Sequence, residues 1–559
     1  MKSIKTILFW FLLGSVLTAC SNDFLDLKQP VEPILETYYT DTATAFSGLV
    51  GCYNSLQQVP SPEAKSLLFF QLDSRSDDTD YAGNPLGASQ ENNYYAAAGF
   101  ANFDIFSDNQ YSLLLWRYGY NGINTINKYM EGVSSMTLTV SQQKLIDQYK
   151  AEAKFIRAYF YFQLVKTFGG VPVFSKSLLQ NEWLVQKRAT ETEVYNQIFT
   201  DLREAIPLLP LKSGYPDAQL NRITKGAAQA LLAKALITNA EVNAASPNWA
   251  EAYILCDEIE KSAQYDLNTN VKDIFSAAGQ TASEHVFDIV FDETIKGEED
   301  SYIHYLSPRY IFKNSVPDHS DKMTYGFGLC AITEDLANQY LADITTAGGT
   351  DTYVYYNQTN NDTLRYTKML DQRGRYTFWS RFEKYLDVYS VDILTTRSET
   401  RNPQTTDDAN YYQRKYNRTS KGLDYAITGV NLHIIRYADV LLLKAEAAYY
   451  TGKNTEALQL VNMVRERAFR QAIANNRITK AQFERNSTGV ALLADIWQER
   501  RLELAGEFDR FNDLKRTHRL ELLEITKPDI LFRTGKHELM PIPAAEISRA
   551  SNIIQNPNY

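Results

Sequence analysis

Cysteine and histidine are scarce in this chain of 559 residues. There are four cysteines and six histidines, and no C-x-x-C pair occurs. Beyond the leading segment, the cysteines are Cys52, Cys256 and Cys330, which are far apart and odd in number. Disulfide frameworks and zinc sites are marked by closely spaced cysteines and histidines. The sequence therefore predicts neither of them, and it predicts no resident metal or cofactor.

Positive charge and long hydrophobic runs are also limited. Lysine and arginine number 57 against 67 acidic residues, so the net charge is -10, whereas nucleic-acid binders usually carry a basic face. After the first 20 residues no segment approaches the ~20 apolar residues of a membrane-spanning helix. The G-x-S-x-G, H-E-x-x-H and P-loop motifs are missing. These absences argue against a nucleic-acid partner, a polytopic membrane protein and the enzymes that those motifs define.

The first residues read as a secretory signal that ends in a lipidation site. Two lysines precede an apolar run from Ile7 to Leu17, which is too short to span a membrane. Leu17-Thr18-Ala19-Cys20 then has the pattern of a lipobox. We expect residues 1–19 to be a signal peptide, Cys20 to be acylated, and residues 20–40 to be a lipidated tether. The alternative is an ordinary cleaved signal with an incidental cysteine.

Apolar residues at helical spacing predict a largely α-helical body in two regions. The first region covers residues 41–240 and includes a loop-rich stretch at 66–112. The second covers residues 241–559 and includes a longer loop-rich insertion at 284–430, where short β-like pieces are visible. Long loops on a rigid scaffold are where binding residues usually lie.

The helical pattern is detailed enough to predict individual ends and pairs. Ser141 is the expected N-cap of a long helix that runs to about Phe168, and the charge of Arg157 on that helix is expected to stay in water. The aromatic residues of that helix recur on its packing face and are expected in the core, as is Trp116 in an earlier helical pattern. Two helical hairpins, 224–252 and 436–470, combine small residues and turns in the manner of tetratricopeptide repeats. The repeats are degenerate and irregularly spaced, so they are expected to be parts of a larger fold.

Five segments, in their order along the chain, resemble the SusD/RagB family of surface lipoproteins from Bacteroidetes-type bacteria. The most characteristic is the helix AEAKFIRAYFYF that leads to FGGVP at residues 168–172. The others are TKGAA at 224–228, IRYADVL at 435–441, ERRLELAGE at 499–507, and the ending QNPNY at 555–559. Each motif alone is weak, but together with the lipobox they cover nearly the whole chain.

The resemblance implies a fold and a role. The fold is mostly α and SusD-like: degenerate tetratricopeptide-type hairpins form one face, and loop-rich, short-stranded insertions form the other. The role is non-catalytic capture of an oligosaccharide, or in some members a peptide, for delivery to a partner TonB-dependent channel of the SusC type. The expected location is the outer membrane, lipid-anchored and facing the cell exterior.

Tyrosine is the abundant residue that suits such a role, with 37 in the chain. Aromatic rings cover the C–H faces of sugars, while Asp, Asn and Arg side chains bind the hydroxyl groups. The two loop-rich stretches hold both kinds of residue, and we select ligand candidates by their position there. These candidates are Asp73, Arg75, Asp77, Tyr81, Asn84, Asn93, Tyr94, Tyr95, Tyr302, Tyr305, Tyr310 and Tyr325.

Three other interpretations stay open. Glu499, Glu503 and Glu507 share one helix face, and a close pair of carboxylates could cleave a glycosidic bond in a lipid-anchored glycoside hydrolase. We favour the alternative that arginines such as Arg500, Arg501 and Arg510, or other helices, neutralise them. The acidic stretch 73–83 lacks the ligand pattern of an EF-hand, so a polar turn is preferred to a calcium site. A third class is a helical scaffold that binds only its channel.

Overall fold

The computed structural model describes most of the helical body and parts of the loop-rich regions. The described residues are 38–58, 73–81, 94–276, 279–292, 294, 306, 310–312, 322–325, 330–345, 351–357, 362–368, 371–380, 411–413, 415–416, 429–476, 478–550 and 552–559. Cys20 therefore lies outside them, as do the signal and most of the tether. No helix in these ranges combines the length and hydropathy needed to cross a membrane.

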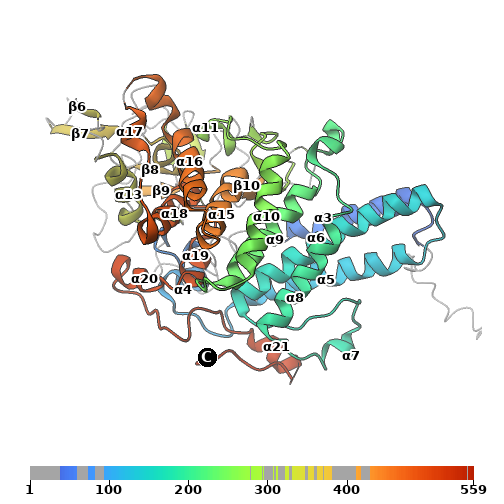
Figure 1. Cartoon of the computed structure of the whole chain (residues 1–559). Helices are drawn as coiled ribbons and strands as arrows, with labels where there is room; N and C mark the ends of the chain where they lie inside the picture. Colours follow the sequence, from blue (N-terminus) through green and yellow to red (C-terminus); the bar gives the residue numbers. More distant parts are fainter. Residues whose placement is uncertain are drawn as a thin grey trace, which may run out of the picture.

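Helices form most of the described structure, which confirms the predicted mostly α fold (Figure 1). The long helices are α3 (Thr42–Gln58), α5 (Gln110–Ser134), α6 (Val140–Phe168), α8 (Glu191–Ala205), α9 (Lys225–Ala240), α10 (Asn248–Lys261), α13 (Glu334–Thr345), α15 (Tyr437–Tyr450), α16 (Asn454–Ala474) and α18 (Gly489–Leu504). Shorter helices are α4 (Tyr94–Asn102), α7 (Gln180–Trp183), α11 (Val271–Ile274), α14 (Gln372–Thr377), α17 (Lys480–Phe483), α19 (Arg510–Arg516), α20 (Glu521–Thr526) and α21 (Ala544–Arg549).

The long helices pack in a continuous series. α5 contacts α6, α6 contacts α8, and the series continues through α9, α10, α15, α16 and α18 (Figure 1). The two predicted hairpins are α9–α10 and α15–α16, and α10 packs directly on α15. Buried alanines such as Ala230 and Ala233 on α9 and Ala252 on α10 leave no bulk between the backbones, so these helices can approach closely. The repeat-like pattern in the sequence therefore corresponds to neighbouring helix pairs in one layer.

The longest helix, α6, has defined caps at both ends. Its N-cap is Thr139, whose hydroxyl accepts from the Gln142 backbone N–H in a capping box, so the cap lies two residues before the predicted cap at Ser141. Gly169 ends it with φ of 71°, a left-handed conformation that glycine adopts without steric cost. The Arg157 charge, predicted to be in water, is instead buried and paired with Asp201 at 2.6 Å.

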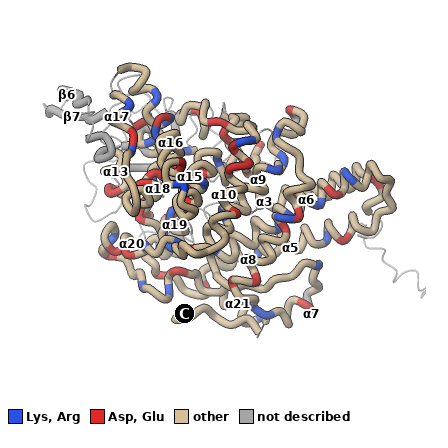
Figure 2. Tube along the Cα trace, in the orientation of Figure 1, with Lys and Arg blue, Asp and Glu red and all other residues tan. Residues whose placement is uncertain are grey.

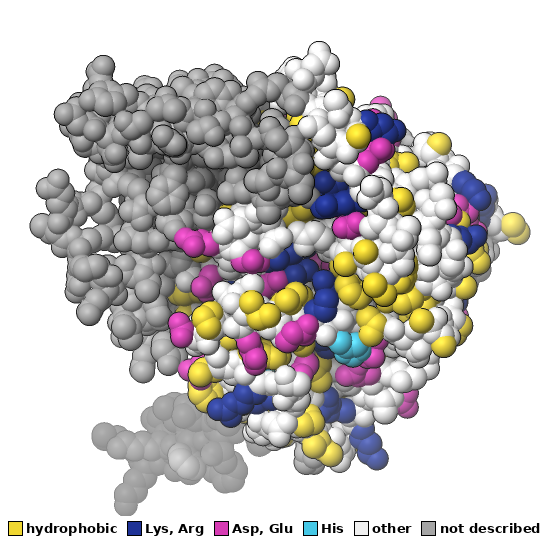
Figure 3. Space-filling view, turned by 60° about the vertical axis from the view of Figure 1, so that its left-hand side comes forward, with side chains coloured by type: hydrophobic (Ala, Val, Ile, Leu, Met, Phe, Trp, Pro, Cys, Tyr) yellow, Lys and Arg dark blue, Asp and Glu magenta, His cyan; other side chains and the backbone are white. Residues whose placement is uncertain are grey.

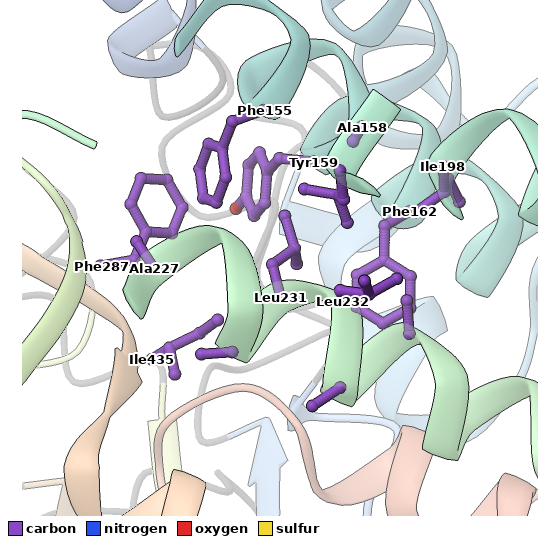
Figure 4. Packing of buried hydrophobic residues seen from close by; sticks show 14 of the residues in the cluster. Phe155, Ala158, Tyr159, Phe162, Ile198, Ala227, Leu231, Leu232, Phe287 and Ile435 are labelled. Atoms are coloured by element: carbon purple, nitrogen blue, oxygen red, sulfur yellow. The ribbon is translucent and has the colours of Figure 1, made fainter. Parts of the chain in front are cut away.

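Aromatic side chains of α6 form the centre of the core (Figure 4). The rings of Phe155 and Phe287 meet edge to face with centroids 4.7 Å apart, and Tyr159 meets Phe287 at 5.5 Å. Leu231 of α9 is buried in the same cluster. The prediction that the aromatic face of this helix is core, not ligand site, is confirmed by the burial of these rings.

The strands are short and lie mainly in the second half of the chain. They are β1 (Thr79–Tyr81), β2 (His285–Ile289), β3 (Tyr310–Phe312), β4 (Lys322–Tyr325), β5 (Cys330–Ile332), β6 (Asp351–Asn357), β7 (Asp362–Lys368), β8 (Phe378–Ser380), β9 (Tyr411–Gln413) and β10 (Leu432–Arg436). One sheet has the order β1-β5-β9-β8, and the others are the antiparallel pairs β10–β2, β3–β4 and β6–β7. In Figure 1, β6 to β9 lie at the opposite end of the molecule from α3 and α5.

Candidate ligand-binding face

The predicted ligand residues are divided between the interior, the edge of the strands and parts of the chain outside the described residues. Tyr81 is the last residue of β1 and is half-buried, with Cys330 as its partner on β5. Tyr94 and Tyr95 begin α4, and Tyr310 and Tyr325 are cross-strand partners on β3 and β4. Asn84, Asn93, Tyr302 and Tyr305 lie outside the described residues.

Asp73, Arg75 and Asp77 are buried, with exposed fractions of 2% or less. The Arg75 guanidinium lies 3.9 Å from the centre of the Phe511 ring and donates to the His537 carbonyl. Burial raises the pKa of Asp73 well above its ordinary value, and nearby Asp78 adds to the rise. These contacts give the three residues a place in the interior, so we do not retain them as ligand contacts.

Asp77 and Asp78 fix the base of this loop to the second half of the chain. Arg510 donates to both oxygens of Asp77 at 2.7 and 2.8 Å, and Arg501 donates to Asp78 at 2.7 Å. Burial alone would raise the pKa of Asp77, but the charges of Arg510 and Arg501 outweigh it and hold that pKa below its ordinary value. The described part of the acidic stretch is a turn at residues 73–78, in agreement with the prediction, and it leads into the strand β1.

β1 is therefore a rigid platform at the root of a loop-rich stretch. Thr333 reinforces it: the hydroxyl donates to the Asp77 carbonyl at 2.8 Å and the backbone N–H donates to the Asp78 carbonyl at 2.9 Å. Arg501 also pairs with Asp335 at the start of α13, at 2.6 Å. The residues of β1 thus have a fixed position, as precise positioning of ligand groups requires.

The acidic face predicted on α18 is neutralised from other elements. Glu499 pairs with Arg465 at 2.8 Å and with Arg373, and Glu503 pairs with Arg467 at 2.5 Å and with Arg436 at 3.0 Å. Glu507, predicted on the same helix face, instead lies beyond the end of α18 at Leu504, where Arg436 reaches it at 2.6 Å. The prediction that arginines neutralise this row is confirmed, although the partners come from other helices and strands.

These carboxylates do not have the properties of a glycosidase acid. Burial would raise the pKa of Glu503, but Arg467, Arg436 and Arg373 outweigh it and keep the pKa lowered. A general acid for glycoside cleavage needs a raised pKa and contact with substrate. Glu499 and Glu503 are each 2% exposed or less, so neither faces a substrate.

Charge of both signs is interleaved over the described structure. In Figure 2, acidic and basic segments alternate along α15, α18 and α19. On the described part of the face in Figure 3, acidic and basic side chains lie beside one another among hydrophobic ones. Arg500 illustrates the pattern in the interior, since it reaches Asp439 at 2.9 Å and Asp513 at 3.2 Å. Ion pairing thus accounts for much of the buried charge.

A cavity of about 250 Å³ lies between α5, α7 and α21. Trp116, Tyr120, Phe174 and Trp183 supply its aromatic walls, and the rings of Tyr120 and Phe174 stack at 5.6 Å. Arg117 lines it as well and pairs with Glu546 at 3.1 Å. Aromatic walls with polar groups are suited to a sugar ring. The sequence predicted Trp116 as core, and its 1% exposure confirms this.

Two family models match the chain. One, described as "SusD family", matches residues 283–559, and the other, described as "Starch-binding associating with outer membrane", matches residues 53–237. The chain belongs to the SusD/RagB family. Its members are binding proteins without catalytic activity, and the mostly helical body with short strands described above is the SusD-like fold.

Three relatives extend this result over the full chain. SusD-like protein P2 of Formosa agariphila is 26% identical and covers 100% of both chains. A structure described as a laminarin-binding SusD-like protein is 24% identical, with a TM-score of 0.70 over 93% of this chain and 100% of the other. The surface glycan-binding protein A of Bacteroides thetaiotaomicron, solved with laminarihexaose, is 22% identical, with a TM-score of 0.67 over 93% and 100%.

Proposed function

We propose that this SusD-like protein captures oligosaccharide at the cell surface and passes it, uncleaved, to a partner TonB-dependent channel of the SusC type. The observation that carries the proposal is the pair of family matches, which together extend from residue 53 to the C-terminus with a gap at 238–282. The lipobox at Cys20 supports an anchor in the outer membrane. Relatives named for laminarin and laminarihexaose make a glycan the first ligand to test.

The binding residues are proposed to be tyrosines on or near β1, α4 and the β3–β4 pair. Tyr81 follows the fixed base at Asp77 and Asp78, and Tyr94 begins the next helix. Tyr310 and Tyr325 are paired on the β3–β4 hairpin, in the same insertion as Tyr302 and Tyr305. A ring held on a rigid base, as Tyr81 is beside the anchored Asp77 and Asp78, loses little conformational freedom when a sugar stacks on it, which favours affinity.

Alanine substitution of two of these tyrosines tests the site. Affinity gels and calorimetry with laminarin, other glycans and peptides should show glycan binding that Tyr94→Ala and Tyr305→Ala weaken. Tyr38→Ala is the matched control, since Tyr38 is an exposed tyrosine before α3. Binding of peptide but no glycan would overturn the glycan proposal. Loss of binding on Trp183→Ala alone would move the site to the cavity beside α7.

The hydrolase alternative makes a distinct prediction. If Glu503 were catalytic, Glu503→Gln would abolish product release while leaving the fold intact. We expect no product release from the unmodified protein, and we expect Glu503→Gln to lower stability, because Arg467 and Arg436 would each lose one of their buried charge partners. Chromatography of the glycan after incubation, with circular dichroism of the variant, separates the two outcomes.

A further inference from the structure

Two histidines and an aspartate converge where β2 pairs with β10. Nδ1 of His433 lies 2.9 Å from one oxygen of Asp288, and Nδ1 of His285 lies 3.2 Å from the other. One potential ligand atom from each residue lies within 4.8 Å of the others. The exposed fraction of the side chain is 1% for His433, 7% for His285 and 5% for Asp288. This cluster has no part in the proposed glycan site.

Irregular strand pairing explains how these side chains meet. The partners are His433 with Asp288, Ile435 with Phe287, and Arg436 with His285, so each strand has one extra residue in this short stretch. In a regular strand, residues three apart point to opposite faces. Bulges re-aim side chains. Here the irregularity brings His285 to the side of Asp288.

The hydrogen bond of His433 Nε2 determines whether Nδ1 of the same ring carries a proton. Nε2 of His433 lies 3.0 Å from the Ile274 carbonyl oxygen, which can only accept, so Nε2 carries the proton in the neutral ring. Nδ1 then presents a lone pair beside the carboxylate of Asp288. Two electron-rich atoms 2.9 Å apart need a cation to hold them, either a second ring proton or a metal ion. Nδ1 of His285 also lies 3.3 Å from the Gln280 carbonyl oxygen, so metal binding at this nitrogen requires its proton to move to Nε2, which has no hydrogen-bond partner among the described residues.

The missing hydrogen bonds at His433 and Asp288 favour a metal over a proton. Although the nitrogens and oxygens are close, His433 Nδ1 and both Asp288 oxygens lack a hydrogen-bond partner of acceptable geometry among the described residues. Ligands at ~2.0–2.1 Å from a tetrahedral metal lie about 3.3 Å apart and point at the metal, not at one another. Metal-bound histidines usually donate their other N–H to a carbonyl, as His433 does to Ile274.

A second acidic cluster shows the contrasting case. Asp257, Glu260 and Glu456 also lie close together, but the Lys444 ammonium reaches them at 2.9, 2.5 and 2.7 Å. No such ammonium lies within ion-pair distance of Asp288 among the described residues. Lys212 is nearby, but it donates to the carbonyl of His285 at 3.1 Å.

We propose that His285, Asp288 and His433 bind one divalent transition-metal ion of the zinc class, with a water at the fourth position. Two imidazole nitrogens and one carboxylate suit zinc better than calcium or magnesium, which prefer oxygen ligands. The rings of Phe275 and Tyr416, centred 5.3 and 5.6 Å from that of His433, exclude water from one side.

The metal acts as a structural tie. β2 precedes and β10 follows the long insertion that holds Tyr302 to Tyr325, so the ion joins the two ends of that segment. A link between the two ends of a long segment limits the conformations that the segment can adopt when it unfolds, and it therefore stabilises the folded segment. The sequence did not suggest this site because its histidines are far apart in the chain and belong to no short motif.

Metal titration of the purified lipoprotein tests the proposal. After treatment with a chelator, zinc should bind at one ion per chain by calorimetry and raise the melting temperature, and cobalt should give the absorption of a tetrahedral site. Asp288→Asn and His285→Gln should weaken binding by at least about 100-fold, since loss of an outer-shell partner alone costs roughly 10–100-fold. Asp257→Asn, in the cluster filled by Lys444, should bind zinc as the unmodified chain does.

The unmodified chain also decides the question if a variant fails to fold. Absence of zinc binding and of any change in melting temperature would overturn the proposal and assign the cluster to a protonated His433 paired with Asp288. Equal affinity in the unmodified chain and Asp288→Asn would overturn it as well. Glycan binding is measured separately, so failure of the metal site leaves the proposed function unaffected.

Discussion

Arginine–carboxylate pairs of the same geometry occur both in the interior and at the surface of this protein. Arg157 and Arg203 both bind a carboxylate with two nitrogens, Arg157 to Asp201 and Arg203 to Glu251. The first pair is 4% and 1% exposed, while the second is 50% and 37% exposed. Equal geometry in different surroundings should produce unequal effects on stability.

Replacing each arginine with methionine measures that difference. Arg157→Met leaves the Asp201 carboxylate buried without its cation, so we expect a loss of about 3–5 kcal/mol in the free energy of unfolding. Arg203→Met should cost less than about 1 kcal/mol, because water screens the exposed pair. Urea unfolding followed by circular dichroism measures both. Equal losses would show that burial does not determine the contribution of these pairs.

His537 gives stability a dependence on pH. Its Nδ1 accepts a hydrogen bond from the Arg533 backbone N–H, and burial, with the charges of Lys536 and Arg75, lowers its pKa to about 4. The unfolded ring takes up a proton near its ordinary pKa of 6.5, while the folded ring stays neutral. Stability should therefore fall as pH is lowered from about 6.5 to about 4.

The variant His537→Gln, which keeps an acceptor, should show a smaller loss of stability over this range. Urea unfolding at several pH values compares it with the unmodified chain, and NMR follows the ring directly. A folded His537 that titrates near 6.5 would contradict the assignment.

The burial of a residue could be predicted where helical periodicity determines it. It could not be predicted where the partner of a charged side chain is distant in the sequence. The helical phase of Phe155 and Tyr159 was enough to place both in the core. Asp77 was selected as a ligand residue because it is polar and lies in a loop-rich stretch. In the structure it is buried and paired with Arg510, which lies more than 400 residues later in the chain. A sequence does not show which distant guanidinium will meet a given carboxylate.

At the scale of elements, close packing between helices depends on the absence of a side chain. A Cβ at Gly122 on α5 would overlap the Phe160 ring on α6, whereas a Cβ at Gly51 on α3 would meet nothing within 4 Å. Capping signals at helix ends were read correctly to within two residues, at Thr139 instead of Ser141. The irregular pairing of β2 and β10 left no such local signal.

Alanine at these two glycines should have opposite effects. Gly122→Ala forces α5 and α6 apart, so we expect a loss of about 1–3 kcal/mol. Gly51→Ala has open space and replaces a poor helix former, so we expect a gain of about 0.5–1 kcal/mol. Thermal unfolding of the two variants compares them directly, and a neutral Gly122→Ala would show that the helix contact is looser than described.

The whole molecule combines a helical body with loop-rich insertions and a predicted lipid anchor. Helix pairs and family motifs were visible in the sequence, because each is local. The division into residues 41–240 and 241–559 stays a prediction, since helices from both halves form one packed series. The ligand tyrosines also stay a prediction, because loop positions alone do not define their contacts.

The anchor has a direct test at this scale. Cys20→Ser removes the acylation site, so the protein should leave the membrane fraction and appear in the soluble fraction. Cell fractionation with an antibody detects the change, and Cys52→Ser is the control because Cys52 is a buried thiol of α3. Continued membrane attachment of Cys20→Ser would show that something other than lipid holds the protein there.

The proposed function is capture of a glycan without cleavage. It can be tested by calorimetric titration of the purified protein with laminarihexaose and a panel of other oligosaccharides, followed by chromatography of the same samples. We predict saturable binding of at least one oligosaccharide, which is then recovered at its full length. Shortened products, or no binding to any glycan alongside measurable binding of peptides, would contradict it.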